Sequence, residues 1–317
     1  MSAGIMPLPA EAIVDNTLMD SALIVSALKN LLSSLGVKAK DAACSISGNS
    51  VIIRKILLPA MSSDELEEQI SWEAEQYIPF DINDVNIDFQ IIGTDNVDPS
   101  KMNVLLVASK KDIINDYVAV FNDAGMQLSI VDVDAFAVQN SFEMNHDVDP
   151  SDVVALINIG ASVMNINVVK GGNTLFSRDV QMGGNLYTEE IQKQLGLTAS
   201  DAESAKMLVT EIQDGGLVNI LMKLNENITQ EIRRSLDFYN STANEDRISK
   251  IFVSGGCSKS YKLFETIGEK LGLPVEKHNP FAKISFSEKE FDHEYLQEIA
   301  PLMAVTVGLA IRRVGDK

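Results

Sequence analysis

Two buried strand-like runs in the second half of the chain end at glycine turns, and these turns constrain the fold most. The run Val153–Ile159 turns through Gly160-Ala161-Ser162 into another apolar run at 163–169. The run Lys250–Ser254 turns through Gly255-Gly256 into a helical stretch. Strands that lead both into strands and into helices predict a mixed α/β fold.

The first half of the chain predicts a compact inserted module. Ser62 and Glu65 form a capping-box pattern at the start of a helix that runs toward Tyr77. Apolar runs around this helix, together with a second helix, give the order β-α-β-β-α-β for residues 50–133. The apolar stripe of the first helix consists of Leu66, Ile70, Ala74 and Tyr77.

Further helices are predicted at both ends and in the middle of the chain. Leucines at helical spacing mark residues 21–35, residues 185–242 are largely helical, and a last helix covers about 296–312. The small residues on one stripe of the last helix are Ala300, Ala304 and Gly308. Because small residues allow close approach, we interpret this stripe as a helix-packing surface.

An excess of acidic side chains restricts the partners. Lys and Arg number 26 against 45 Asp and Glu, which gives a formal charge of −19. Such a surface repels phosphate backbones and anionic lipids, so we expect no nucleic-acid binding and no direct lipid binding. A short basic or amphipathic peptide suits it better. The longest apolar stretch, Ala300–Ile311, is too short for the roughly 20 residues of a membrane span, so a cytoplasmic protein is predicted.

Both glycine turns are candidate phosphate or nucleotide contacts. A glycine lets the backbone approach a phosphate, and neighbouring amides or the Ser162 hydroxyl can donate to it. Helix N-termini bind anions, and Gly255-Gly256 permits flat access for a nucleobase. The first turn is more often purely structural, and the second is equally compatible with a tight corner between strand and helix.

Other catalytic signals are missing from the sequence. It contains no Walker loop, no Gly-x-Gly-x-x-Gly, no Gly-x-Ser-x-Gly and no metal-ligand spacing. Glu203 and Lys206 are interpreted as surface residues of a helix, and Trp72 and Phe80 as core residues more often than binding anchors. The histidines, which lie on polar segments and are expected to be exposed, are His146, His278 and His293.

In their order along the chain, these pieces resemble the actin/heat-shock-chaperone/sugar-kinase ATPase superfamily. The resemblance places a second phosphate motif at Asn158–Ser162, an adenosine motif at Ser254–Cys257, and connecting helices at Asp134–Asn145 and Ala300–Gly308. Within the superfamily, the run Trp72–Phe80 resembles the PilM family of type IV pilus assembly proteins. The family likeness extends to the runs Asp132–Ala137, Phe176–Asp179, Gly183-Gly184 and Arg233–Tyr239.

The resemblance implies a two-lobed actin-like fold, similar to the cell-division protein FtsA, with an inserted 1C module in place of actin's 1B. The implied subdomains are lobe 1A at 1–40, 131–150 and 296–317, the 1C module at 41–130, lobe 2A at 151–184 and 248–295, and helical 2B at 185–247.

The resemblance also implies a site for ATP with Mg²⁺ in the cleft between the lobes. Glu203 and Lys206 match a helical Glu-x-x-Lys that reaches the ribose in related ATPases. The residues implied to contact the cofactor are Asn158, Gly160, Ala161, Ser162, Glu203, Lys206, Gly255, Gly256 and Cys257. Little or no hydrolysis is expected, and no catalytic residue is assigned.

In the family, a groove between subdomains 1A and 1C captures the cytoplasmic tail of the membrane protein PilN. Ile78 and Phe80 are the candidate wall residues of such a groove, and the alternative is that both close the core of the module. The resemblance implies a scaffold for pilus assembly and twitching motility, with or without regulation by nucleotide. It would attach peripherally to the inner membrane through a PilN-like protein and meet other pilus assembly proteins.

Two departures from the superfamily pattern are expected to matter. Actin-like proteins begin with a hairpin that carries Asp-x-Gly-Ser/Thr, whereas Gly4–Pro9 resembles the end of the third strand. About 30 residues of lobe 1 would then be missing, and nucleotide binding by this chain would be weak. Asn158 replaces an Asp that many superfamily members carry, and an amide cannot supply the carboxylate that holds a hydrated Mg²⁺.

Two other functions remain open on the same fold. A phosphotransferase of the sugar-kinase type would need an Asp placed as a base near either glycine turn, and the sequence has none there. A coupled kinase assay across sugars would test it. A filament-forming protein like FtsA would be distinguished by pelleting with and without ATP.

Overall fold

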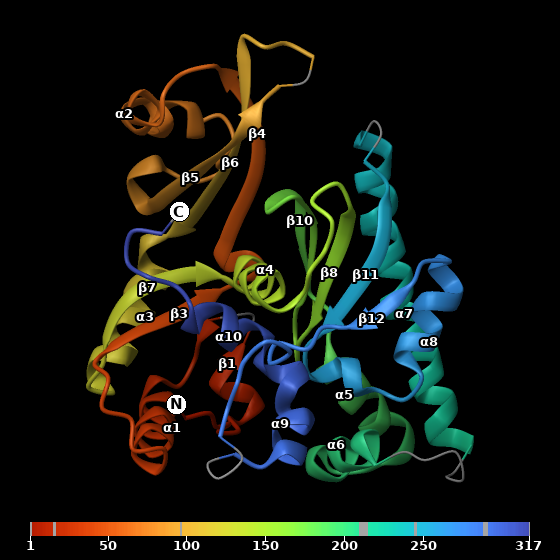
Figure 1. Ribbon diagram of the computed structural model, residues 1–317. Helices are drawn as coiled ribbons and strands as arrows, with labels where there is room; N and C mark the ends of the chain where they lie inside the picture. Colours follow the sequence, from red (N-terminus) through yellow and green to blue (C-terminus); the bar gives the residue numbers. More distant parts are fainter. Residues whose placement is uncertain are drawn as a thin grey trace. The chain divides into compact units, whose positions relative to one another are not determined.

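The computed structural model describes residues 2–14, 17–95, 97–208, 215–243, 246–287 and 291–316. The chain divides into two compact units, which are residues 1–133 with 309–317 (unit 1) and residues 134–308 (unit 2). Both units combine sheets with helices, so the mixed α/β class is confirmed (Figure 1). The finer division into subdomains 1A, 1C, 2A and 2B stays a prediction.

Unit 1 contains the sheets β1-β2, β3-β7 and β4-β6-β5 among its described residues. Its strands are β1 Ile13–Val14, β2 Thr17–Leu18, β3 Asp41–Ile46, β4 Val51–Pro59, β5 Val85–Thr94, β6 Lys101–Lys110 and β7 Gln127–Val133. Its helices are α1 Ser21–Ser34, α2 Ser63–Ala74 and α3 Lys111–Asp123, with 3₁₀ turns at Ala10–Ala12, Gly48–Ser50 and Ile82–Asp84.

The elements from β4 to β7 confirm the predicted order β-α-β-β-α-β, but they belong to two different sheets. Strands β4, β6 and β5 pair antiparallel, with Val51 opposite Ser109 and Val85 opposite Lys110. Strand β7 instead pairs in parallel with β3. Because parallel neighbours cannot be joined by a short hairpin, residues 47–126 form the crossover between these two strands.

Helix α2 begins at the predicted capping box, in which the Glu65 amide donates to Ser62 Oγ and the Ser62 amide donates to a Glu65 carboxylate oxygen. The helix ends at Ala74, before the predicted end at Tyr77. The stripe that packs on the β4-β6-β5 sheet therefore continues from Ala74 to Ile78, which is buried, whereas Tyr77 is exposed. The core of this module consists of Ile56, Leu58, Leu66, Ile70, Ala74, Ile78, Val85, Phe89, Met102, Val104, Leu106 and Ala108.

Unit 2 is built on one sheet of five strands in the order β10-β9-β8-β11-β12. Strands β8, β9 and β10 are antiparallel neighbours, and β8, β11 and β12 run in parallel. The strands are β8 Val153–Ile159, β9 Met164–Lys170, β10 Asn173–Val180, β11 Ile248–Ser254 and β12 Val275–Lys277. The helices are α4 Asp134–Asn145, α5 Gly184–Leu195, α6 Ala199–Met207, α7 Gly215–Thr242, α8 Leu263–Leu271, α9 His293–Ile299 and α10 Ala304–Ala310.

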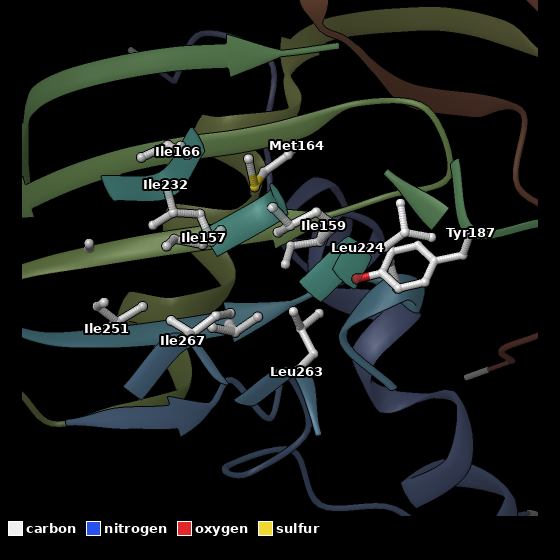
Figure 2. Close-up of a cluster of buried hydrophobic side chains, with 14 of the residues drawn as sticks. Ile157, Ile159, Met164, Ile166, Tyr187, Leu224, Ile232, Ile251, Leu263 and Ile267 are labelled. Atoms are coloured by element: carbon white, nitrogen blue, oxygen red, sulfur yellow. The ribbon is translucent and has the colours of Figure 1, made fainter. Parts of the chain in front are cut away.

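The main core of unit 2 lies where α5, α7 and α8 pack on this sheet (Figure 2). Strand β8 contributes Ile157 and Ile159, which have no exposed surface, and α7 contributes Ile232. Because β8 is central and covered by neighbours, every one of its residues is buried, as the continuous apolar run predicts.

The last helical region is broken where the sequence predicts one helix. Helix α9 passes into a 3₁₀ turn at Ala300–Met303 before α10 begins, because Pro301 has no backbone N–H to donate. The predicted small-residue stripe packs closely at Gly308, where a Cβ would lie 1.7 Å from the carbonyl oxygen of Ala137 in α4. The stripe is therefore a contact between two helix backbones.

Candidate functional site

The loop between β8 and β9 presents the first glycine turn. The Gly160 amide donates to the Val163 carbonyl at 3.0 Å, which closes the turn. Ala161 and Ser162, at its tip, are exposed. The backbone of this tip and the Ser162 hydroxyl can therefore reach an anion in solution, as the sequence predicts for a phosphate contact.

The start of α5 holds this loop in place through the backbone. The Gly184 amide donates to the Gly160 carbonyl at 2.9 Å, and the Asn185 amide donates to the Ala161 carbonyl at 2.8 Å. A Cβ on Gly183 would lie 2.5 Å from the Gly160 oxygen. Gly183 is thus required for the close approach of the two segments, which fixes the position of the loop tip.

Asn158, at the end of β8, belongs to a buried chain of side-chain hydrogen bonds. Ser254 Oγ donates to Asn158 Oδ1 at 3.1 Å, and Asn158 Nδ2 donates to Asn165 Oδ1 at 3.0 Å. Asn165 Nδ2 then donates to Asp179 Oδ1 at 2.8 Å. Both polar atoms of the Asn158 amide are used, and a carboxylate there would lack the donor that this chain requires.

Lys206 is buried, contrary to the surface position expected from its sequence. Its Nζ donates to the Gly184 carbonyl at 3.1 Å, to Thr188 Oγ1 at 3.1 Å and to Glu203 Oε2 at 2.6 Å. Glu203 is exposed, so the ammonium lies inside while its carboxylate partner faces solvent. The pair at i and i+3 of α6 thus presents an anchored carboxylate that can accept hydrogen bonds from hydroxyl groups.

The second glycine turn, after β11, is a crowded corner. Gly255 has φ +89°, and a Cβ on it would lie 2.3 Å from the Ile159 oxygen, so only glycine fits. The chain continues from Gly256 as a 3₁₀ turn to Lys259, and α8 begins only at Leu263. The expected helix N-terminus at Gly255-Gly256 is therefore wrong.

Cys257 follows this corner and is buried. Burial raises the pKa of its thiol to about 12, so the group stays protonated at neutral pH. A protonated, buried thiol is a poor nucleophile, and we assign Cys257 a packing role.

The three segments that carry the predicted cofactor residues meet at Gly184. Its amide binds the first glycine turn, its carbonyl accepts from Lys206, and a Cβ on it would lie 3.5 Å from the Cβ of Cys257. The exposed backbone at 160–162 and the Glu203 carboxylate suit the phosphate and sugar of a nucleotide. Mg²⁺ fits less well. Both polar atoms of the Asn158 side chain are already hydrogen-bonded, and in the described residues no group of three His, Cys, Asp or Glu is placed to hold a metal.

Unit 1 contains a groove between its two principal sheets, with a volume of about 160 Å³. Its walls come from β3 and β7 on one side, from β4, β5 and β6 on the other, and from α3. The lining is mainly apolar, and polar groups are contributed by Asn86, Asp88, Ser109 and Asp132. The apolar lining residues are Ile46, Val51, Ile87, Val107, Ala108, Ile114, Val131 and Val133.

The two candidate wall residues of the sequence analysis are placed differently. Ile78 is only 5% exposed and packs in the core of the β4-β6-β5 module. Phe80 is 37% exposed, and Lys110 Nζ lies 4.3 Å from the centre of its ring. Phe80 does not line the groove itself, and Lys110 directly follows the lining residue Ser109.

A family model described as type IV pilus assembly protein PilM matches residues 2–314. The chain belongs to the PilM family. In a solved PilM-PilN type IV pilus biogenesis complex, one chain shares 28% of its sequence with this chain at a TM-score of 0.88. The match covers 98% of this chain and 90% of that one.

Two more distant structures share the fold of this PilM-family chain. One is the ethanolamine utilization protein EutJ from Carboxydothermus hydrogenoformans, with 12% identity and a TM-score of 0.57, and the match covers 95% of this chain and 77% of that one. The other is MreB 5 of Spiroplasma citri bound to AMPPNP, with 12% identity and a TM-score of 0.52, and the match covers 94% of this chain and 77% of that one. The predicted actin-like fold is confirmed. In the part of the chain that the structure describes, no helix combines the length and apolar character needed to cross a membrane.

Two of the three histidines expected to be exposed form a pair in this PilM-family chain, in which His278 is buried and His146 is partly buried. His146 Nε2 and His278 Nδ1 are 3.0 Å apart, and His278 Nε2 is 3.0 Å from Ser141 Oγ. His278 is 3% exposed, and Phe142 stacks on the His146 ring. The sequence offered no signal for this pair, because the two residues lie on polar segments far apart in the chain.

Proposed function

We propose that this chain is a scaffold of type IV pilus assembly that captures the cytoplasmic tail of a PilN-like membrane protein. The observation that carries the proposal is its likeness, over 98% of its length and at a TM-score of 0.88, to a chain of the PilM-PilN complex. The tail would bind in the groove of unit 1.

The groove has the size and chemistry of a site for one apolar anchor. A dry apolar cavity of about 150 Å³ holds a benzene ring, so a groove of about 160 Å³ holds one large apolar side chain of the tail. Burying such a side chain contributes about 1.5–3 kcal/mol. Ile114 from α3 and Val131 from β7 are only partly buried and would contact this side chain.

Charged groups near the groove favour a tail with a basic flank. Asp132 lies at the buried side of the groove and is paired with Arg312 at 3.0 Å. Asp88 lies at the exposed side. A basic residue beside the apolar anchor would meet Asp88, and the overall charge of −19 would steer it there.

This binding mode would attach the protein to the cytoplasmic face of the inner membrane peripherally. Its acidic surface is repelled by anionic lipids, so the attachment would come from the PilN-like protein.

Ile114→Ser should weaken binding of a PilN tail peptide at least fivefold, because it removes part of the apolar wall, worth about 1 kcal/mol. Fluorescence anisotropy of a labelled peptide measures the dissociation constant. Ile113→Ser is the matched control, since Ile113 is the adjacent, equally half-buried residue of α3 that does not line the groove. Equal loss in both variants would contradict the assignment of the groove.

Phe80→Ala and Ile78→Ala refine the same experiment. Phe80→Ala should weaken peptide binding and leave the melting temperature nearly unchanged, whereas Ile78→Ala should lower the melting temperature because Ile78 is buried. If no PilN tail peptide binds the protein at all, the scaffold proposal itself fails.

We also propose that an adenine nucleotide contacts unit 2 at the turn 160–162 and at Glu203, whose carboxylate Lys206 anchors, beside the Gly255-Gly256 corner. The convergence of these segments at Gly184 supports this site. The Asn158 hydrogen-bond chain argues against a tightly held Mg²⁺ and therefore against efficient hydrolysis.

Ser162→Glu should weaken ATP binding at least tenfold, because a negative charge at the loop tip repels the phosphates. Ser200→Glu is the control, since Ser200 is also exposed and the change in net charge is the same. Calorimetry measures both affinities. ATP binding that is equal in the two variants would exclude the loop as a phosphate contact.

A further inference from the structure

The outer face of α2 carries an exposed tryptophan that no part of unit 1 explains. Trp72 is 76% exposed and is the single tryptophan of the chain. The helix packs on the β4-β6-β5 sheet through Leu66, Ile70 and Ala74, and Trp72 is not part of this core. An exposed side chain of this size and rigidity is typical of a binding anchor.

Two carboxylates flank Trp72 on the same face of the helix. Glu68 lies four residues before it and Glu75 three residues after it, which are the spacings of neighbours on a helix surface. Both are exposed. Among the described residues, neither forms an ion pair with a Lys or Arg.

The stability of the helix does not explain these charges. Glu73 and Glu75 lie at the C-terminal end of α2, where the helix dipole is negative and no basic residue compensates. An acidic group there is unfavourable, so a bound cation would relieve an unfavourable interaction. The segment 62–80 contains no Lys or Arg. Its acidic residues are Asp64, Glu65, Glu67, Glu68, Glu73 and Glu75.

We propose that the Trp72 face, defined by Glu68, Trp72 and Glu75, docks an arginine-bearing helix of a partner protein. An arginine guanidinium can stack on the indole ring and at the same time pair with a carboxylate at i−4 or i+3. A second copy of this acidic chain and an anionic lipid surface are disfavoured by charge. The Trp72 face is separate from the groove, so this proposal does not depend on the PilN tail.

The probe is a synthetic helical peptide with two arginines four residues apart, compared with peptides that carry Lys or Glu at these places. Because Trp72 is the single tryptophan, its fluorescence reports binding directly. We expect a saturable change with the Arg peptide, binding at least threefold weaker with the Lys peptide, and none with the Glu peptide. No saturable change with the Arg peptide, or equal binding of all three, would overturn the proposal.

The double variant E68Q/E75Q should weaken binding of the Arg peptide at least fivefold. E265Q/E269Q is its control, because these two exposed glutamates on α8 have the spacing i, i+4 and their removal changes the net charge equally. Trp72→Ala, measured by anisotropy of a labelled Arg peptide, should also weaken binding at least fivefold without changing the melting temperature. Equal losses in the two double variants, or unchanged binding by Trp72→Ala, would contradict docking on this face.

Discussion

Replacing Gly308 with alanine should destabilise unit 2 by about 3–5 kcal/mol or prevent it from folding. The new Cβ would lie 1.7 Å from the carbonyl oxygen of Ala137 and 2.5 Å from its carbonyl carbon. The obstacle is the backbone of α4, which cannot rotate away as a side chain could. The two helices would have to separate, and their packing would be lost.

The control for this prediction is Gly268→Ala, in the helix α8 of the same unit. A Cβ on Gly268 meets its nearest neighbour at 3.6 Å, which is ordinary contact. Alanine also has the better helix propensity, so this variant should gain up to about 1 kcal/mol. Urea unfolding followed by circular dichroism measures both effects. A Gly308→Ala protein as stable as the Gly268→Ala protein would contradict the close contact of α10 with α4.

The stability of unit 2 should fall as the pH drops below about 6.5, because of buried His278 and its partly buried neighbour His146. Burial, with a smaller contribution from the neighbouring His146, lowers the pKa of His278 from an ordinary value of 6.5 to about 3. Burial also lowers the pKa of His146, which is surrounded by Glu276, Lys283, Asp147 and Lys250. Each ring is therefore favoured in its neutral form in the folded protein.

The direction of the effect follows from proton uptake. Above pH 6.5 these histidines are neutral in both states and the stabilisation is complete. As the pH falls toward 3, the unfolded chain binds a proton at His278 and the folded chain does not. The free energy of unfolding then decreases by up to about 1.4 kcal/mol per pH unit for this residue.

Denaturant unfolding between pH 8 and 5 measures this slope. The slope is proportional to the number of protons taken up on unfolding. His278→Gln should lower this number by nearly one, whereas His293→Gln, at an exposed position on α9, should leave it unchanged. The slope is informative even if His278→Gln lowers the stability at every pH. The same slope in His278→Gln and the unmodified protein would show that the pair is not the cause.

The local features of the fold could be predicted from the sequence. The capping box at Ser62 and Glu65 fixes the start of α2, and the predicted glycine turn at Gly160 joins β8 to β9, closed by the Gly160 amide on the Val163 carbonyl. These features depend on hydrogen bonds between residues a few positions apart, so the chain itself specifies them.

The burial of single polar or aromatic side chains could not be predicted in the same way. Lys206 and His278 have polar side chains, yet both are buried. They contact Gly184 and Ser141, respectively, which are distant from them in the sequence. Trp72 was expected in the core and is exposed, because Leu66, Ile70 and Ala74 already fill that face of α2. Such positions are decided by tertiary contacts, which no local pattern encodes.

The candidate site was predictable as a set of segments and not as a set of contacts. The glycine turns and the Glu-x-x-Lys were visible in the sequence, and their convergence at Gly184 depends on the packing of α5 against the β8-β9 loop. The groove of unit 1 depends on the spacing between two sheets, so most of its lining residues could not have been named from sequence.

The parallel pairing of β3 with β7 has a consequence for the order of folding. These strands meet only after residues 47–126 have been closed into a loop, and the entropy cost of closure grows with loop length. Within that loop, β4, α2, β5 and β6 are joined by short connections and have a hydrophobic core of their own. This module can therefore collapse first and shorten the effective loop, which brings β3 and β7 close enough to pair with each other.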